Sequence, residues 1–581
     1  MPDYFRAVAV DFDGTLTSAG RPDEAVLDAV AETRQSGRRV VLVTGRILAE
    51  LREVFPDVEQ CFDALVTENG AVISGTWGRR PVADAVDPRI RHELERRGHQ
   101  VRSGRVLLAC RAEADVDALA LIQRLGLGYQ LVYNRSELMI LPAGVTKASG
   151  LAQALVDLGL SPHSSIGIGD AENDHSLLES CELGVAVANA VDALKDHADL
   201  VLDESNGLGV AAFLRGPVVD GTQRIHPRRW HVQLGTTSTG EPVTVPASQV
   251  NVLITGASRS GKSYLTGLLA EQLIDLGYSV VLVDPEGDHT NLGVLPGVAV
   301  VGGSQVPPDA DHLAHLVSQG RGSVVVDLSQ LGADARSTYY GAAAPRLSEL
   351  RAHSGLPHWL IFDEAPEPLS TQAAARSLYE PSRKGHCLVT HRPAELGGDS
   401  IDDLDVLIAM LPDPARRDAE ESRMYLESLS AFTGLTSEEL AMRTAGLEGA
   451  TAVLVRPSAP HLLVPFTLGT RRTSHVRHWH SYTDGILDWH RRFFFHRGEH
   501  KPTGAVAANL VQFHHELTHC SPAVVCHHVR NADFSRWVDG VLRDTILAGQ
   551  FRRIERAHPD QADAEAARTQ LLTALEERYL G

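Results

Sequence analysis

The chain has 581 residues, of which 43% are hydrophobic and 22% are charged, and its formal net charge is −20. This length exceeds what one hydrophobic core usually organises, so we expect three or four domains. The acidic balance argues against a surface that coats nucleic acid, and no apolar run approaches the roughly 18 residues of a membrane span. Six scattered cysteines and a start without an apolar leader favour a cytoplasmic protein with reduced thiols.

The pattern of apolar and polar residues predicts two α/β domains followed by a helical tail. Residues 1–215 alternate β-rich runs with amphipathic stretches, which indicates a parallel sheet flanked by helices. A different pattern over about residues 77–142 predicts an inserted α+β unit. Breakers at 216–229 mark a linker. Residues 230–468 repeat the α/β pattern, and residues 469–581 form a histidine-rich segment that we expect to be helical.

A first candidate site follows an apolar strand expected at residues 8–11. The strand leads into Asp11-Phe12-Asp13-Gly14-Thr15. Alternation along the strand directs the side chains of Asp11 and Asp13 to the same side, at the strand end where open α/β sheets bind ligands. Such a pair suits phosphate chemistry, because one carboxylate can attack phosphorus while the other transfers protons.

Further polar groups follow in order, each near the end of an expected strand. Thr44 offers a hydroxyl, and Lys147 begins a helix after the insertion and can neutralise developing charge. The segment from Gly169 to Asp174 supplies carboxylate and amide oxygens, which are ligands that Mg²⁺ prefers. These groups together predict a magnesium-dependent site.

These motifs, with Thr67-Glu68-Asn69-Gly70-Ala71, resemble the haloacid dehalogenase superfamily in its Cof-like branch, whose members carry a large inserted cap. The resemblance covers residues 5–215 and implies a Rossmannoid core with an α+β cap. It also implies hydrolysis of a small phosphorylated molecule, such as a sugar phosphate or phosphoglycolate, through an aspartyl-phosphate intermediate.

The resemblance also implies a role for each site residue. Asp11 would be the nucleophile and Asp13 the general acid and base, and Thr44 and Lys147 would hold the phosphoryl group. The implied Mg²⁺ ligands are Asp11, the carbonyl of Asp13 and Asp170, supported by Asn173 and Asp174.

A second candidate site lies in the middle of the chain, after a buried-type strand expected at residues 251–255. The segment Gly256-Ala257-Ser258-Arg259-Ser260-Gly261-Lys262-Ser263 has the G-x-x-x-x-G-K-[ST] spacing of a phosphate-binding loop. Its backbone, including Gly256, Ser258, Ser260 and Gly261, is expected to cradle the phosphates of ATP. Lys262 would contact the terminal phosphates, and Ser263 would help to hold Mg²⁺.

Two later strands supply the other groups that ATP hydrolysis needs. An apolar strand ends at Asp363-Glu364, where Asp363 can position Mg²⁺ through water and Glu364 can polarise the attacking water. Another strand ends at Thr390, and the segment Thr390-His391-Arg392-Pro393 is a candidate sensor of the γ-phosphate.

This combination, with Asp284-Pro285-Glu286-Gly287-Asp288, resembles the HerA/FtsK clade of P-loop, RecA-like ATPases over residues 230–470. The resemblance implies a homo-oligomeric ring, often a hexamer, with an arginine finger that Arg376 or Arg383 would supply. Long DNA-guarding insertions are not visible, so transport of DNA is not favoured.

The tail is unusual in its histidine content, because eleven of the 27 histidines lie between His475 and His528. His515-Glu516-Leu517-Thr518-His519 fits the zinc protease pattern H-E-x-x-H, although local enrichment makes a chance match easy. A structural zinc site on Cys520, Cys526, His527 or His528 is a second alternative. A helical packing domain rich in aromatic contacts is the favoured interpretation.

The leading hypothesis is therefore a Mg²⁺-dependent phosphomonoester hydrolase coupled to, or regulated by, an ATP-hydrolysing ring domain. The expected partners are a phosphorylated small molecule and ATP. Two alternatives remain, and both would involve nucleic acid: a nucleic-acid end-processing kinase-phosphatase, and a DNA-associated motor with an accessory phosphatase.

Overall fold

The structure is a computed structural model, and its contacts divide the chain into two compact units. The first unit comprises Met1–Leu282, Pro308–Val324 and Ala333–Thr470, and the second comprises Val283–Pro307, Val325–Gly332 and Arg471–Gly581. The residues that the structure describes are 4–134, 136–257, 260–319, 322–365, 379–391, 393, 396, 403–411, 436, 439, 451–457, 459–473, 487, 489–498, 501–542, 544–558 and 563–580.

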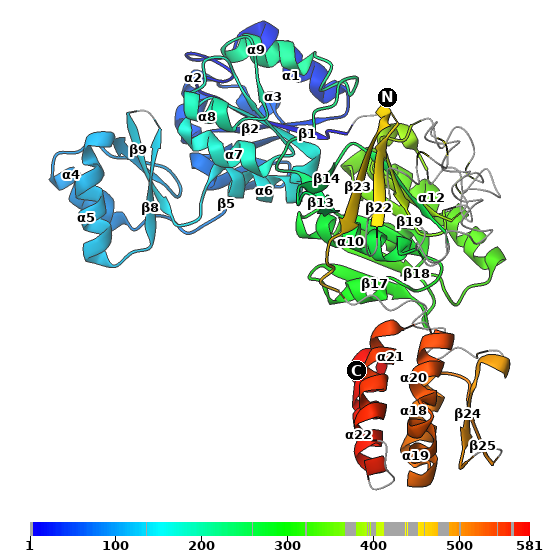
Figure 1. The fold of residues 1–581 in the computed structure, drawn as a ribbon. Helices are drawn as coiled ribbons and strands as arrows, with labels where there is room; N and C mark the ends of the chain where they lie inside the picture. Colours follow the sequence, from blue (N-terminus) through cyan, green and yellow to red (C-terminus); the bar gives the residue numbers. More distant parts are fainter. Residues whose placement is uncertain are drawn as a thin grey trace. The chain divides into compact units, whose positions relative to one another are not determined.

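The first domain is built on a sheet with the strand order β12-β11-β10-β1-β2-β3-β4-β5 (Figure 1). Its strands are β1 (Ala7–Asp11), β2 (Arg39–Val43), β3 (Ala64–Thr67), β4 (Val72–Gly75), β5 (Gly78–Pro81), β10 (Ser165–Gly169), β11 (Leu183–Ala186) and β12 (Leu200–Val201). β1 pairs in parallel with both β2 and β10. Every residue of β1 and β10 is buried, as expected for parallel strands covered on both faces.

Helices cover the two faces of this sheet. They are α1 (Glu24–Gln35), α2 (Leu48–Val54), α3 (Val58–Cys61), α6 (Lys147–Asp157), α7 (His175–Ser180), α8 (Asp192–His197) and α9 (Asn206–Leu214). α1 packs against α9, and α6 packs against α7, and Figure 1 shows these two pairs on opposite sides of the sheet. This α/β core confirms the fold class predicted from the sequence.

The inserted cap has a sheet of its own, with the strand order β6-β7-β9-β8. Its elements are α4 (Pro88–Arg96), β6 (Arg102–Ser103), β7 (Leu108–Arg111), α5 (Asp115–Leu125), β8 (Tyr129–Asn134) and β9 (Glu137–Pro142). Ile90 and Leu94 of α4 pack with Leu121 of α5 and Ile140 of β9 in a separate core. The expected boundary at residue 77 lies just before β5, which pairs with β4 in the main sheet, so the separate cap sheet begins later.

The strands of the second α/β domain that lie in the first unit, β16 with its first three residues only, run in the order β14-β13-β23-β22-β21-β15-β20-β19-β16. They are β13 (His231–Thr236), β14 (Pro242–Pro246), β15 (Asn251–Gly256), β16 (Val280–Asp284), β19 (Trp359–Phe362), β20 (His386–Thr390), β21 (Val406–Met410), β22 (Thr451–Arg456) and β23 (Ala459–Leu468). β15 pairs in parallel with β20 and β21, whereas β22 and β23 pair antiparallel. The helices of this domain are α10 (Lys262–Asp275), α11 (Ala310–Ser318) and α12 (Ala333–Ser354).

The tail is helical, as predicted, and also contains an antiparallel pair of strands, β24 (Phe493–His496) and β25 (Pro502–Ala507). Aromatic residues favour the strand over the helix at this point, and the backbone N–H of Lys501 donates to the carbonyl of Gly498 between the two strands. The helices are α18 (Leu510–His519), α19 (Pro522–Arg530), α20 (Asp533–Trp537), α21 (Thr545–Ala557) and α22 (Ala564–Leu575). Phe493, Phe513 and Phe534 meet in its core, which explains the aromatic content of this segment.

Two general features bear on the environment of the chain. Among the residues described, no helix is both long and apolar enough to cross a lipid bilayer. All six cysteines are free thiols.

Candidate functional site

The first candidate site lies where three neighbouring strands end. β1 ends at Asp11, β2 ends just before Thr44, and β10 ends just before Asp170. Because β2, β1 and β10 are adjacent and parallel, their carboxyl ends meet at one edge of the sheet. The structure therefore brings together residues that are up to about 160 positions apart in the sequence.

Lys147 connects two of the predicted acids. It is the first residue of α6, whose N-terminus is fixed by Thr146 accepting a hydrogen bond from the backbone N–H of Ser149. Lys147 is 1% exposed, and its Nζ lies 2.6 Å from Asp11 Oδ1 and also donates to Asp174. Burial alone would lower the pKa of Lys147, but the charges of Asp11 and Asp174 raise it above its ordinary value. The ammonium therefore stays charged and is held against the predicted nucleophile.

The acids around Lys147 form a buried cluster. Ligand oxygens of Asp11, Asp170 and Asp174 all lie within 4.8 Å of one another. Burial and then repulsion from Asp174 raise the pKa of Asp11 well above its ordinary value. A single lysine does not neutralise three buried carboxylates, so this donor set fits a divalent cation with oxygen ligands.

Asp170 and Asp174 take different parts in this cluster. Asp174 Oδ2 accepts from the backbone N–H groups of Asp170 and Ala171, each at 3.0 Å, while its other oxygen meets Lys147. Asp174 therefore holds the loop in shape. Asp170 Oδ1 accepts from the hydroxyl of Thr15 at 3.0 Å. A Cβ at Gly14 would lie 2.2 Å from Asp170, so this close approach requires glycine.

Asp13 faces a cavity between the core and the cap. Its side chain is 41% exposed, and Arg46 grips both of its carboxylate oxygens, with contacts of 2.6 and 2.7 Å. The cavity has a volume of about 320 Å³, and Arg102, Glu137 and Met139 line it from the cap side. The opening of this cavity beside Asp13 leaves room for the leaving part of a substrate.

The sequence prediction did not include Arg46. It expected the hydroxyl of Thr44 to hold the phosphoryl group, and in the structure this hydroxyl contacts the backbone of its own loop. Thr44 is fully buried, and its Oγ1 accepts from the backbone N–H of Arg46 at 3.1 Å. Arg46 lies only two residues after the predicted threonine, so proximity was the signal that could have found it. The pairing of Arg46 with Asp13, however, depends on the direction that the Arg46 side chain takes in the folded site.

The second candidate site begins where β15 ends. Gly261 has φ of 101° and precedes α10, which starts at Lys262 and continues with Ser263. Lys262 is 6% exposed, and its Nζ donates to the carbonyls of Gly256 and Ala257 at 3.1 and 3.3 Å. The hydroxyl of Ser260 is buried without a hydrogen-bond partner among the described residues. Ser258 lies outside the described residues.

The predicted acids and the candidate sensor lie on the strands beside this loop. Thr255 of β15 is in register with Thr390 of β20, and β20 pairs in turn with β19, which ends just before Asp363. Asp363 is 3% exposed and accepts from the backbone N–H of Glu364 at 3.1 Å. His391, which follows Thr390 in the candidate sensor segment, contacts Glu364 at 3.0 Å.

The structure does not assign the arginine finger to either of its two candidates. Arg376 lies outside the described residues, and Arg383 forms an ion pair with Glu380 in its own chain.

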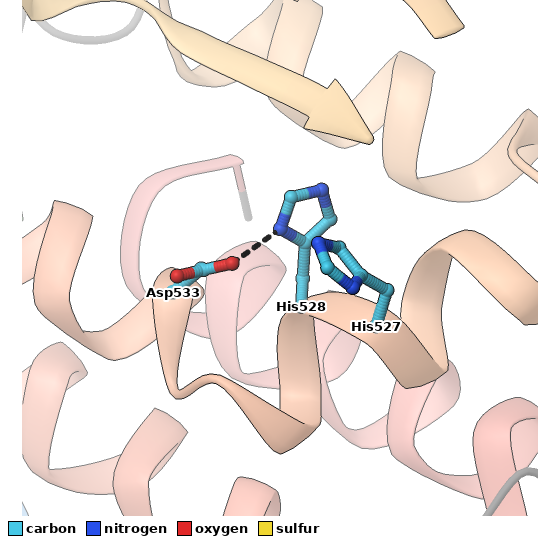
Figure 2. Close-up of side chains that lie close together, drawn as sticks. All are labelled: His527, His528 and Asp533. Atoms are coloured by element: carbon cyan, nitrogen blue, oxygen red, sulfur yellow. Dashed lines mark hydrogen bonds and ion pairs between the residues drawn. The ribbon is translucent and has the colours of Figure 1, made fainter. Parts of the chain in front are cut away.

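Several of the tail histidines that the structure describes contact protein groups. His528 is buried, its Nδ1 lies 2.7 Å from Asp533, and its Nε2 accepts from the backbone N–H of His496 at 2.8 Å. Figure 2 shows the His528 ring directed toward Asp533, with His527 beside it on the same helix. Both ring nitrogens of His528 are thus occupied, which argues against its use as a zinc ligand. His515 and His519 are exposed on α18, and His519 Nδ1 contacts the carbonyl of His515 at 2.7 Å.

Comparison with known proteins gives two families. Residues 8–85 and 131–214 match haloacid dehalogenase-like hydrolases, and residues 234–340 match the central domain of the helicase HerA. The unmatched residues between 85 and 131 contain α4 and α5 of the cap.

Individual relatives cover the first domain. A phosphoglycolate phosphatase of Archaeoglobus fulgidus is 32% identical over 36% of this chain and 96% of its own length. Phosphoglycolate phosphatase 2 of Saccharolobus solfataricus is 28% identical over 36% of this chain and 90% of its own length. A solved haloacid dehalogenase-like hydrolase from B. subtilis aligns with 36% of this chain and 99% of its own, at 19% identity and a TM-score of 0.32. Through its first domain, the chain belongs to the haloacid dehalogenase-like hydrolases, and that domain is joined to one similar to the central domain of HerA.

Proposed function

We propose that the first domain hydrolyses a small phosphomonoester with the help of Mg²⁺. The observation that carries the proposal is the buried arrangement of Asp11, Lys147 and Asp170 at one sheet edge, beside a cavity that Asp13 enters. An attacking carboxylate, a fixed cation and a partly exposed second carboxylate are the groups that phosphate transfer to an aspartate needs.

Each residue of the site has a separate task in this proposal. The Asp11 carboxylate attacks phosphorus, and the bond from phosphorus to the leaving oxygen breaks. Asp13, on the cavity side, gives that oxygen a proton and then takes one from the water that hydrolyses the aspartyl phosphate. Lys147 stabilises the charge of the transferring group. Asp11 and Asp170 would hold Mg²⁺, which supplies further neutralisation of the phosphoryl oxygens when it is bound.

The proposed substrate is a short phosphorylated metabolite, and phosphoglycolate is the first compound to test. The two curated relatives described above are named for this activity. A cavity of about 320 Å³ suits a small molecule. Its wall carries Arg46 and Arg102, which pair with Asp13 and with Glu50 and Glu137, so a substrate carboxylate would share these cations with the protein's own acids.

We further propose that the second domain binds and hydrolyses ATP. Gly261, Lys262 and Ser263 would bind phosphate and Mg²⁺, with Asp363 and Glu364 in the roles of metal support and water activation. Thr390 would respond to the γ-phosphate. Assembly into a homo-oligomeric ring is part of this proposal and rests on the resemblance to HerA.

Contacts between the two domains support regulation of the phosphatase by nucleotide. The residues that form these contacts all belong to the first compact unit. Glu182, which precedes β11, is fully buried and accepts from the hydroxyls of Ser248 and Tyr278. His163 contacts Glu182 at 3.0 Å and the carbonyl of Leu276, at the end of α10, at 2.9 Å. The helix that begins at Lys262 therefore ends against the phosphatase domain.

Two substitutions test the assignment of the two activities. Phosphate release is measured from phosphoglycolate and other small phosphomonoesters, with and without Mg²⁺, and ATP hydrolysis is measured separately. Asp11→Asn should abolish the first activity and leave ATP hydrolysis, because it removes only the nucleophile. Lys262→Ala should have the opposite effect. Retention of phosphatase turnover in Asp11→Asn, or of ATP hydrolysis in Lys262→Ala, would refute the corresponding assignment.

A further inference from the structure

The turn after β3 has an unusual backbone. Glu68, Asn69 and Gly70 follow one another with φ of 55°, 54° and 102°. Glu68 and Asn69 are not glycine, and residues other than glycine rarely adopt this left-handed backbone conformation. All three are buried, so the surrounding structure holds the turn in this shape.

The side chain of Glu68 reaches from the core into the cap. It is fully buried, and its Oε1 accepts from the backbone N–H of Arg105 at 2.8 Å. Oε2 accepts from the N–H groups of Val106 and Leu107, at 2.8 and 3.1 Å. These three consecutive donors lead directly into cap strand β7 and converge on one carboxylate. Arg79 approaches the same carboxylate to 3.9 Å.

The cap segment is shaped to receive this carboxylate. A Cβ added at Gly104 would lie 2.4 Å from Glu68 Oε2, so a side chain at that position would push the carboxylate away. The backbone of Gly104 does not have a positive φ, and its glycine is therefore explained by this close approach.

The same turn contacts the catalytic loops of the core. Glu68 N–H donates to the carbonyl of Arg46 at 2.9 Å, and Asn69 N–H donates to that of Thr44 at 3.0 Å. The side chain of Asn69 accepts from Asn173 at 3.1 Å. A Cβ at Gly70 would lie 1.8 Å from the carbonyl of Thr146, just before Lys147. The turn thus touches the loops after β2 and β10 and the start of α6.

We propose that Glu68 is a positioning residue that fixes the cap over the phosphatase site through its three backbone hydrogen bonds. The proposal rests on the proposed phosphatase function for its catalytic consequence. Its carboxylate ties the start of β7 to the turn that supports Thr44, Arg46 and Asn173. Loss of this link should leave the reacting groups in place but let the cap move away from the cavity.

The test uses Glu68→Gln in the full-length protein. Glutamine keeps the size of the side chain, but its amide N–H groups would face backbone N–H groups that now donate to oxygen. Hydrogen exchange of the amides of residues 105–107 should accelerate by about tenfold or more. With p-nitrophenyl phosphate as the probe, KM should rise by about fivefold or more, while kcat stays within about threefold.

Two further variants make the test specific. Gly104→Ala disturbs the same link from the cap side without removing the charge, and it should reproduce both effects. Asp63→Asn is the control, because Asp63 also accepts from a backbone N–H, that of Val40 at 2.9 Å, and lies in the same domain away from the site. It should leave exchange at 105–107 and KM unchanged.

The exchange measurement separates this proposal from the phosphatase assignment, because it needs no turnover. Wild-type exchange at residues 105–107 in Glu68→Gln would overturn the link itself. Accelerated exchange with an unchanged KM, or with loss of kcat alone, would overturn its positioning role. Absence of hydrolysis in the wild type would refute the proposed function and leave the exchange result to decide the link.

Discussion

Arg46 is the side chain whose position most affects the proposed acid and base. Its guanidinium binds both oxygens of Asp13, and this pairing raises the pKa of Arg46. A two-point contact fixes the orientation of a carboxylate as well as its position. Arg46 therefore aims the Asp13 carboxylate in addition to lining the cavity.

We expect Arg46→Ala to impair reactions that need a proton on the leaving group. For phosphoglycolate, kcat should fall by about tenfold or more, since a misplaced general acid forfeits part of its contribution. For p-nitrophenyl phosphate, whose leaving group departs without a proton, the loss should be smaller. Steady-state kinetics with both substrates checks this difference.

Arg21→Ala is the matched control for this experiment. Arg21 also binds both oxygens of an aspartate, Asp57, but on the exposed surface. It should leave both rates unchanged. Equal losses on the two substrates in Arg46→Ala would contradict the positioning role and indicate a general effect on binding.

At the scale of elements, one histidine of the tail connects segments that are separate in the chain. His528 of α19 connects β24, through the N–H of His496, to Asp533 at the start of α20. Its ring also packs against Phe493 and Phe534, with centroids 5.0 and 5.4 Å away. One buried imidazole therefore joins three elements of this domain.

His528→Ala should weaken the tail, because it leaves the backbone N–H of His496 without its acceptor and removes one of the partners of Asp533, at a cost of about 1–3 kcal/mol. Faster hydrogen exchange in β24 and α20 of the full-length protein would show this loss. His514→Ala is the control, since His514 pairs with Glu576 at the surface, and it should have little effect.

Metal removal gives an independent check on the role of His528 in the tail. Treatment with EDTA should not change exchange in β24, α19 or α20. A marked acceleration after chelation, or stoichiometric zinc in the purified protein, would contradict the role assigned to His528.

At the scale of the whole molecule, the remaining question is whether the two sites influence each other. α10 starts at Lys262 and ends near Tyr278, and α7 starts just after Asp174 and ends near Glu182. Burial and then the charge of Glu182 raise the pKa of Tyr278 well above its ordinary value, so the phenol keeps its proton and donates to Glu182. This buried bond joins elements that lead to both sites.

If nucleotide regulates the phosphatase through this bond, Glu182→Gln should abolish the regulation. We expect ATP to change the wild-type phosphatase rate by about twofold or more, an effect of ordinary size for allosteric coupling. The variant should keep its rate without nucleotide to within about threefold but lose the response. Phosphate release from p-nitrophenyl phosphate, with and without ATP, provides the measurement.

Glu32→Gln, which alters a surface pair with Arg215, is the control and should respond to ATP as the wild type does. A wild type that is indifferent to ATP would rule out regulation. A Glu182→Gln variant that still responds would rule out this route.

Much of the architecture could be predicted because it depends on local patterns. The α/β class of both large domains follows from the alternation of buried strands and amphipathic helices. The tail was harder, because aromatic side chains such as Phe493 and Phe495 are compatible with a helix until their partner strand β25 is known. The pairing of β5 with β4, which joins residues 78–81 to the core sheet, likewise depends on a partner strand that the local pattern does not identify.

The sequence by itself determined the groups that carry the proposed chemistry. Asp11 and Asp13, or Gly261 and Lys262, are neighbours in the chain, so covalent geometry places them together once the strand before them is identified. Only the tertiary structure decided which distant groups control them. The contacts of Arg46 with Asp13 and of Glu68 with the 105–107 backbone span 33 and up to 39 residues. They depend on how loops pack at the sheet edge, where side-chain direction and burial, rather than spacing in the chain, decide which groups meet.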